Sequence, residues 1–488
     1  MKKLLMPMVV SVVLCSIGEY VPAAETDASP PKSVNVAIYD TGFALINELR
    51  SAQLDKGENK VRFRQFPARL DPSTVAFSFV AGSASVEVFE QQFQYDLAGV
   101  GRMLNRFMGK PIEVVSGPVS RKGVLLYSSD DGAPLAIRGE DGAVNLFANS
   151  ESLTDIVFPG AEQIASLEPT LNCRMTAAQD SLQNVRVTFV TEGIRWDGSY
   201  EAILHQGEGA CFIVARANVY NESGGRFENA RVRLISTEKG SISPTASRSD
   251  SAEAAPALRF SYGSEEPALD RTVASAGSLS TYELPRPLTM EPGAALHVQL
   301  CMGRRVPVTK FYVYDGVQFD RFQRNRRNDW NYGTEFHQTV ETHLQFENTQ
   351  ASGLGIDLPP GLFRLYQQRT DASLDLIGED YLRATPAGAT AAVLLGPARG
   401  ILGERERTGY SEVTPLHEYE ESFEIRLENN SPEEIEIRVV EHLYRWNQFE
   451  VVKADTDYKA TGPQTIEFRP VLKPGGKRTV HYTVRYRW

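Results

Sequence analysis

The sequence predicts an all-β protein made of several domains. Short segments of alternating polarity recur along most of the chain, and the last is the clearest: Val480, Tyr482, Val484, Tyr486 and Trp488 alternate with polar or charged residues. A repeat of two residues places one apolar face of a strand against a core. Turn sequences rich in Gly, Pro, Asn and Asp separate these segments, and no stretch has the period of a long helix or coiled coil. This combination is typical of β-sandwiches and small barrels.

The first 23 residues have the organisation of a secretory signal peptide. Lys2 and Lys3 precede an apolar stretch, and Val21-Pro22-Ala23 supplies small residues before a cut at Ala24. The apolar stretch is shorter than the roughly 20 residues that span a bilayer, and no later segment is long enough. We therefore expect an exported protein, periplasmic or extracellular, without a transmembrane segment after signal removal.

A lipoprotein is the alternative for this leader. Lipid-modified Cys15 would then become the mature N-terminus, but Leu14 is bulky where that processing requires a small residue. The cleaved signal peptide is the preferred interpretation.

Residues 34–97 are expected to form a small N-terminal β domain. The turn Asp55-Lys56-Gly57-Glu58 connects two of its strands as a hairpin. The expected strands are Val34–Tyr39, Phe43–Gln53, Lys60–Phe66, Val75–Phe79 and Val86–Tyr95.

Residues 98–165 are expected to form a small SH3-like or Sm-like barrel. Two acidic turns, residues 129–132 and 139–142, end in Gly and suit tight hairpins. They lack the full ligand spacing of a calcium loop, so we expect solvated turns. The five expected strands are Pro111–Val115, Gly123–Ser128, Pro134–Arg138, Val144–Phe147 and Asp155–Phe158.

The remaining chain divides into a central β domain at 166–240, a linker or excursion at 241–280, and a C-terminal immunoglobulin-like sandwich at 281–488. The linker is rich in Ser, Ala, Pro and Glu and has no sustained periodicity, which indicates flexibility. The sandwich is expected from eight strands: Ala295–Met302, Thr309–Tyr314, Thr339–Phe346, Leu362–Gln367, His417–Leu427, Glu434–Glu441, Thr465–Phe468 and the final strand.

Composition and cysteine content exclude several kinds of function. The formal charge of −11 argues against nucleic-acid binding, because the phosphates of a nucleic acid require a basic protein surface. Once Cys15 leaves with the signal, Cys173, Cys211 and Cys301 allow one disulfide and one free thiol, or no disulfide. Their spacing contains no CxxC, so neither a zinc site nor a thioredoxin-type motif is indicated.

Short motifs occur in three parts of the chain. The N-terminal ones are Tyr39-Asp40-Thr41-Gly42-Phe43-Ala44-Leu45-Ile46, Phe66-Pro67-Ala68, Leu70-Asp71-Pro72-Ser73-Thr74-Val75 and Gln94-Tyr95-Asp96-Leu97. The central ones are Thr191-Glu192-Gly193-Ile194-Arg195-Trp196 and Asn221-Glu222-Ser223-Gly224. The most specific are Gly353-Leu354-Gly355-Ile356, Leu358-Pro359-Pro360-Gly361, Leu376-Ile377-Gly378-Glu379-Asp380, Gly403-Glu404-Arg405, Tyr419-Glu420-Glu421 and Val439-Val440-Glu441-His442-Leu443.

On these motifs, the chain resembles bacterial secreted or envelope proteins that carry domain of unknown function 4139, some of them mucoidy-inhibitor-like. The motifs consist of turn glycines and prolines, strand aromatics and paired charges, so the resemblance implies an architecture and an envelope location but no reaction. Relatives of the mucoidy-inhibitor type carry a coiled coil between their domains, where this sequence has the small barrel-like unit.

A search for catalytic motifs predicts no catalytic residue, metal site or cofactor. The sequence has no GxSxG elbow, phosphate loop or HExxH. One strand face carries His417, Tyr419 and Glu421, with Glu418 and Glu420 beside them. We expect a solvated strand face there rather than a metal site or an acid/base pair. The neighbours Glu441 and His442 point to opposite faces and so cannot chelate one ion. Glycoside cleavage needs two carboxyl groups at a suitable distance across the sugar, and Glu379/Asp380 and Glu140/Asp141 are the candidate pairs, whose distance the sequence does not supply.

One segment stands out as a binding candidate. Its basic and aromatic side chains suit an anionic glycan, a lipid headgroup or an acidic partner, although such a run is also typical of a solvated loop. This basic-aromatic patch consists of Arg321, Phe322, Arg324, Arg326, Arg327, Trp330 and Tyr332.

Two classes of function remain. The first is a non-enzymatic exported cell-envelope protein whose β-sandwich scaffold binds an envelope protein or a glycan. The second is an extracytoplasmic, glycan-directed hydrolase whose site is assembled from loops remote in sequence. A deep pocket with converging carboxylates or histidines favours the enzyme, and shallow faces favour binding.

The leader gives the first testable prediction. Exported protein should begin near Ala24, because signal peptidase cuts after the small residue of Val21-Pro22-Ala23. N-terminal sequencing of protein recovered from the cell envelope checks this. Retention of Met1 would contradict export by cleavage, and a diacylated Cys15 would favour the lipoprotein.

Overall fold

The computed structural model describes residues 24–79, 86–129, 131–149, 153–204, 209–236, 280–317, 332–334, 336–415 and 417–487. The expected signal peptide, the expected linker except Ser280, Trp488 and all of the basic-aromatic patch except Tyr332 lie outside these residues.

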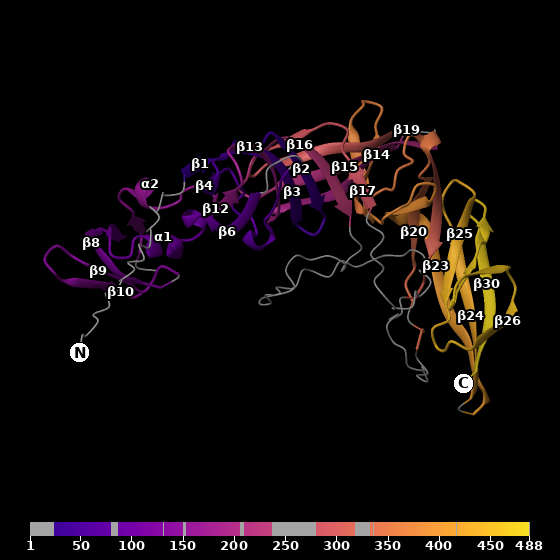
Figure 1. Cartoon of the computed structure of the whole chain (residues 1–488). Helices are drawn as coiled ribbons and strands as arrows, with labels where there is room; N and C mark the ends of the chain where they lie inside the picture. Colours follow the sequence, from indigo (N-terminus) through magenta and orange to yellow (C-terminus); the bar gives the residue numbers. More distant parts are fainter. Residues whose placement is uncertain are drawn as a thin grey trace, which may run out of the picture.

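The fold is all-β, as the sequence predicts. The described helices are short: α1 (Val100–Arg106), α2 (Ala161–Ile164) and the 3-10 turns η1 (Pro72–Thr74), η2 (Asp96–Ala98) and η4 (Gln350–Ser352). The strands form four sheets, which follow one another along an elongated arch (Figure 1). The small unit with β8 to β10 lies at one end of the arch, and the last strands lie at the other.

Two sheets pack face to face in the N-terminal half. The first has the order β1 (Ala24–Asp27), β4 (Gly57–Phe63), β12 (Thr170–Ala177) and β6 (Val86–Gln94). The second has the order β17 (Ser280–Glu283), β16 (Phe227–Ser236), β2 (Ser33–Tyr39), β3 (Phe43–Leu54), β13 (Ser181–Glu192) and β5 (Ala76–Phe79), with β18 (Leu288–Met290) beside β16. One core fills the space between them and includes Ile46, Phe63, Met175, Phe189 and Val232.

This core joins segments that are distant in sequence. β13 pairs with β3 along its whole length, and β16 pairs with β2 in parallel. Strands expected in the N-terminal domain at 34–97 and in the central domain at 166–240 therefore share sheets and a core. Where independently folding domains begin and end stays a prediction.

The small unit is inserted between β6 and β12 and has its own core, which includes Leu104, Phe107, Val114, Leu125 and Ile137. Its sheet has the order β10 (Val144–Phe147), β9 (Leu135–Arg138), β8 (Val119–Ser128), β7 (Pro111–Ser116) and β11 (Asp155–Val157). Within the described residues no pairing joins β10 to β11, so the expected barrel is an open sheet. β10 and β11 are thus the two edge strands of this sheet, with four and three residues.

The largest sheet runs from the middle of the chain to its end. Its main path is β22 (Leu374–Leu382), β21 (Gly361–Gln368), β14 (Ile194–Leu204), β15 (Ala210–Asn221), β19 (Ala295–Tyr314), β20 (Thr339–Glu347), β23 (Thr390–Thr414), β24 (Glu418–Asn429), β30 (Lys477–Arg487) and β26 (Phe449–Ala454). β25 (Ile435–His442), β27 (Tyr458–Gly462), β28 (Thr465–Phe468) and β29 (Val471–Leu472) branch from it.

Several strands of this sheet differ from the sequence-based expectation, which did not include β22, β23, β26, β27 or β29. The two strands expected at 295–302 and 309–314 are one strand, β19, of 20 residues. β23, with 25 residues, was not expected, because its glycines and Pro397 resemble turn signals. The pairings of β23 with β20 and with β24 contain register shifts, which accommodate the glycines and Pro397 within the strand. At Gly403 an added Cβ would lie 2.5 Å from ring atoms of Tyr314, so only glycine lets the strand pass there.

The C-terminal part is a β-sandwich, and the inward face of its last strand is confirmed. Val480, Tyr482, Val484 and Tyr486 on β30 are each at most 3% exposed. The ring centroid of Tyr482 lies 5.6 Å from that of Phe468 on β28, so the two layers meet across this core.

The three described cysteines form no disulfide. Cys173 and Cys211 are buried and Cys301 is partly buried. Burial raises the pKa of the Cys173 and Cys211 thiols to about 12 and that of Cys301 to about 11. All three thiols are therefore protonated at neutral pH. In the described part of the chain, every helix is too short or too polar to cross a membrane.

Replacing Tyr486 with Ala should lower the free energy of unfolding by about 3 to 5 kcal/mol, because a buried aromatic side chain leaves a cavity. Urea unfolding followed by circular dichroism measures the change. Tyr458→Ala is the control, since Tyr458 is 45% exposed on β27 and should cost far less. Equal losses for the two variants would contradict the inward placement of β30.

Candidate functional site

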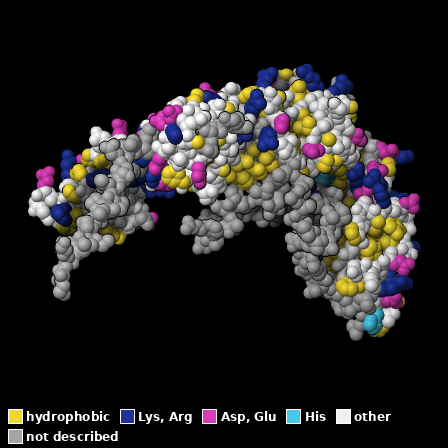
Figure 2. Space-filling model, in the orientation of Figure 1, with side chains coloured by type: hydrophobic (Ala, Val, Ile, Leu, Met, Phe, Trp, Pro, Cys, Tyr) yellow, Lys and Arg dark blue, Asp and Glu magenta, His cyan; other side chains and the backbone are white. Residues whose placement is uncertain are grey.

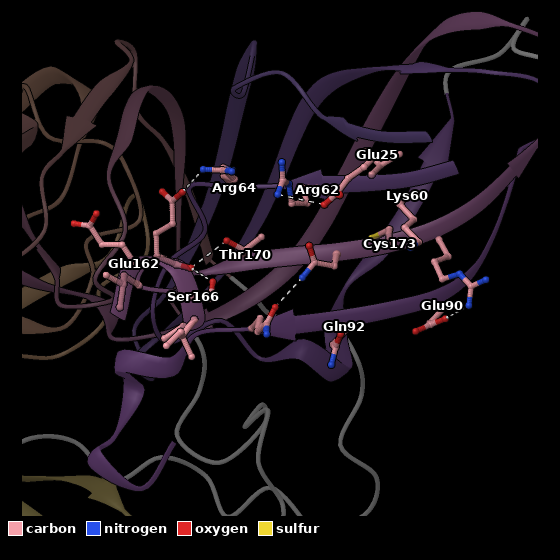
Figure 3. Close-up of a pocket in the computed structure, with 18 of the residues that line it drawn as sticks. Glu25, Lys60, Arg62, Arg64, Glu90, Gln92, Glu162, Ser166, Thr170 and Cys173 are labelled. Atoms are coloured by element: carbon pink, nitrogen blue, oxygen red, sulfur yellow. Dashed lines mark hydrogen bonds and ion pairs between the residues drawn. The ribbon is translucent and has the colours of Figure 1, made fainter. Parts of the chain in front are cut away.

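An open groove of about 1070 Å³ lies between the first sheet and the small unit. Its floor is the outward face of β4, β12 and β6, and its wall is α2 with the segment that follows it (Figure 3). On β4, Val61 and Phe63 are buried in the core, which turns Lys60 and Arg62 outward. The other outward floor residues are Arg64, Glu90, Gln92, Gln94, Thr170, Asn172 and Arg174.

The floor residues form rows across the strands. Arg62 lies opposite Asn172, and Asn172 lies opposite Gln92. Successive rows of a sheet are about 6.8 Å apart and neighbouring strands about 4.8 Å apart. The floor is therefore a regular array of hydrogen-bond donors and acceptors.

Ion pairs hold the charged floor residues in place. Arg62 Nε lies 2.8 Å from Asp27, and Arg64 Nη1 lies 2.8 Å from Glu168. Arg174 contacts Glu58 and Glu90. The hydrogen bond to Asp27 is the main cause that raises the pKa of Arg62.

The charges around the groove balance. Four basic residues, Lys60, Arg62, Arg64 and Arg174, face four acidic residues, Glu25, Glu90, Glu162 and Glu168. The protein as a whole carries −11. The groove thus selects neither a polyanion nor a polycation by charge alone.

Asp96 fixes the wall relative to the floor. Its carboxylate accepts hydrogen bonds from the backbone N–H of Ser166 at 2.7 Å and from Arg106 Nε at 3.1 Å. Its own backbone N–H donates to the Ser166 carbonyl at 2.9 Å. Asp96 opens η2 and Ser166 follows α2, so this contact ties together the two connections between the small unit and the first sheet.

A second cluster of charges is buried in the C-terminal sandwich. Arg405 pairs with Glu441 at 2.9 Å, and Arg445 pairs with Glu421 at 2.8 Å. The side chains of both pairs are at most 3% exposed. The Tyr482 hydroxyl donates to Glu441, and burial raises the pKa of Tyr482 well above its usual value.

This buried cluster also holds one member of the basic-aromatic patch. Arg445 Nη2 donates to the Tyr332 carbonyl at 3.1 Å, and Arg405 Nη1 donates to the Gly333 carbonyl at 2.6 Å. The Arg445 guanidinium carbon lies 5.4 Å from the Tyr332 ring centroid. The patch members Arg321, Arg324, Arg326, Arg327 and Trp330 lie outside the described residues.

The acidic residues of β24 and the Glu441-His442 pair of β25 lie in different environments. Glu418 and Glu420 pair with arginines of β30 near the surface. The expected solvated face is wrong for Glu421, which is 3% exposed, because that face turns toward the sandwich core. Glu441 and His442 do point to different partners: Glu441 contacts Arg405, and His442 Nε2 lies 3.1 Å from Asp315.

The structure does not favour hydrolysis at any of these positions. Thr465, His442 and Asp315 lie in the order of a nucleophile, a base and an acid. However, the Thr465 hydroxyl lies 3.4 Å from His442 Nδ1, and Thr465 is only 7% exposed, so a substrate has little access to it. Glu379 pairs with Arg364, and Asp380 accepts from the Leu394 N–H. Asp141 accepts from the Ala143 N–H in its turn. The described residues contain no group of three metal-ligating side chains.

Removing the Asp96 carboxylate should loosen the wall of the groove. Asp96→Ala leaves the Ser166 N–H and Arg106 without an acceptor and should cost about 2 kcal/mol of stability. Asp96→Asn keeps one acceptor and should cost less. Urea unfolding and amide hydrogen exchange at Ser166 measure both effects.

Asp375→Ala is the control, because it breaks a half-exposed ion pair with Arg369. Exposed ion pairs contribute little to the free energy of unfolding. Unchanged exchange at Ser166 in Asp96→Ala would show that Asp96 does not hold the wall.

The comparisons with known proteins bear on the C-terminal two thirds of the chain. Residues 185–488 match the domain of unknown function DUF4139. A comparison with curated proteins finds no match. The matched segment contains the buried cluster of Arg405, Glu421, Glu441 and Arg445, whereas all groove residues precede it. Because the match covers more than half of the sequence, the chain belongs to the DUF4139 family.

Proposed function

We propose that this protein is an exported, non-enzymatic cell-envelope protein that binds a glycan in the groove beside its first sheet. The charge-balanced lining of the groove and the hydrogen-bonding side chains of its floor carry this proposal. The signal-like leader supports the location.

The chemistry of the floor favours a sugar over other ligands. The outward residues of β4, β12 and β6 that line it are polar, whereas protein interfaces depend on apolar and aromatic anchors and drug-sized ligands on mostly apolar pockets. Sugar hydroxyl groups both donate and accept hydrogen bonds. They match a floor that mixes amides such as Asn172 and Gln92 with arginines and carboxylates.

The groove as a whole gives little support to glycoside cleavage. Hydrolysis requires two carboxyl groups, one of which holds a proton. In the groove Glu25, Glu90 and Glu168 each pair with an arginine, and their side chains are 52 to 58% exposed. Each of these three carboxylates is thus already engaged in an ion pair at the surface.

Binding of oligosaccharides tests the proposal. Protein beginning at Ala24 should bind cellotetraose, chitotetraose or another member of an oligosaccharide panel in isothermal titration calorimetry. Combining Asn172→Ala with Gln92→Ala should weaken binding at least tenfold, because two hydrogen-bonding groups of the floor are lost.

The matched control is Gln368→Ala with Asn447→Ala, which removes two exposed amides outside the groove and should leave the affinity unchanged. Absence of binding to every sugar, or equal losses in both double variants, would overturn the proposal. Release of new reducing ends would instead establish the hydrolase, and saturable binding of a peptide alone would establish a protein partner.

A further inference from the structure

Strand β6 contains an irregularity at one end of the groove. Glu90 lies opposite Arg174 and Val88 lies opposite Met175, so Phe89 is an extra residue with no partner of its own in the ladder. This is a β-bulge on the edge strand of the first sheet.

The bulge changes which face Phe89 occupies. Val86, Val88 and Phe93 pack against the core, while Glu90 and Gln92 line the groove. Strict alternation from Phe93 would put Phe89 inward with the core residues. The extra residue instead places Phe89 on the outer side beside Glu90, where its ring is 50% exposed.

Arg174 connects this ring to the groove. Its guanidinium carbon lies 5.3 Å from the Phe89 ring centroid. Glu58 and Glu90 hold the same guanidinium, which lines the groove. The aromatic ring thus adjoins the Arg174 end of an otherwise polar floor.

Protection of the sheet edge does not account for this residue. A bulge by itself discourages pairing with another chain, and charged side chains strengthen that protection. A half-exposed phenylalanine adds apolar surface at the edge and opposes it. The ring packs against Arg174, and the half of its residue surface that stays exposed is open to a ligand.

We infer that Phe89 is a stacking platform for one pyranose ring of the glycan, and so a specificity-determining residue of the groove. This inference rests on the proposed function. A pyranose with mainly equatorial hydroxyls presents a face of C–H groups, which packs on an aromatic ring, while its edge hydroxyls reach Arg174 and Glu90. The ligand class is accordingly a chain of glucose-configured or N-acetylglucosamine-configured units.

Substitutions at Phe89 test the inference with cellotetraose and chitotetraose as probes. Phe89→Ala should weaken binding about tenfold, and Phe89→Leu nearly as much, because leucine keeps the apolar bulk but has no flat face. Phe89→Trp should retain binding, and its added fluorescence should shift when the sugar is present. Tyr127→Ala is the control, since Tyr127 is equally exposed, at 52%, on β8 of the small unit.

The outcomes separate this inference from the proposed function. If Asn172→Ala with Gln92→Ala weakens binding and Phe89→Ala does not, the stacking role is wrong and the glycan groove stands. If the unsubstituted protein binds neither probe, the stacking inference falls; if no sugar of the panel binds, the proposed function falls with it. Equal effects of Phe89→Ala and Tyr127→Ala would also overturn the stacking role.

Discussion

The pairing of β12 between β4 and β6 is the constraint on which the N-terminal half depends. These strands come from residues 57–63, 86–94 and 170–177, and the small unit occupies the chain between β6 and β12. Their inward residues complete the core, and their outward residues form the groove floor. The bulge that exposes Phe89 also belongs to this pairing. The core, the floor and the aromatic ring therefore follow from one set of strand neighbours.

The C-terminal sandwich depends on buried charge as well as on apolar packing. Removing ions from water is costly, and the pairs of Arg405 with Glu441 and of Arg445 with Glu421 offset that cost only in close, hydrogen-bonded geometry. Isolated members of such pairs are strongly destabilising. The cluster unites the motifs Gly403-Glu404-Arg405, Tyr419-Glu420-Glu421 and Val439-Val440-Glu441-His442-Leu443. Three of the six most specific motifs of the resemblance thus act in the architecture of the sandwich.

The two clusters of charge have different environments. In the groove, ion-paired side chains such as Glu168 remain about half exposed and available to a ligand. In the sandwich, the side chains are enclosed and their partners are fixed. The groove precedes the DUF4139 segment, so the residues of the proposed glycan site and the matched family segment lie in different parts of the chain. On the face drawn in Figure 2, basic and acidic side chains are interspersed.

The sequence by itself determined the fold class, the inward face of β30 and the separation of Glu441 from His442, because a period of two assigns side chains to faces locally. It did not determine what each face meets. The face of Glu421 was expected to be solvated, but the opposing layer encloses it. No pattern in the sequence brought the polar faces of β4, β6 and β12 together. Only the tertiary structure decided the open small unit, the groove and the exposure of Phe89. Strand neighbours distant in sequence are selected by packing and hydrogen bonding across the whole chain, which local periodicity does not encode.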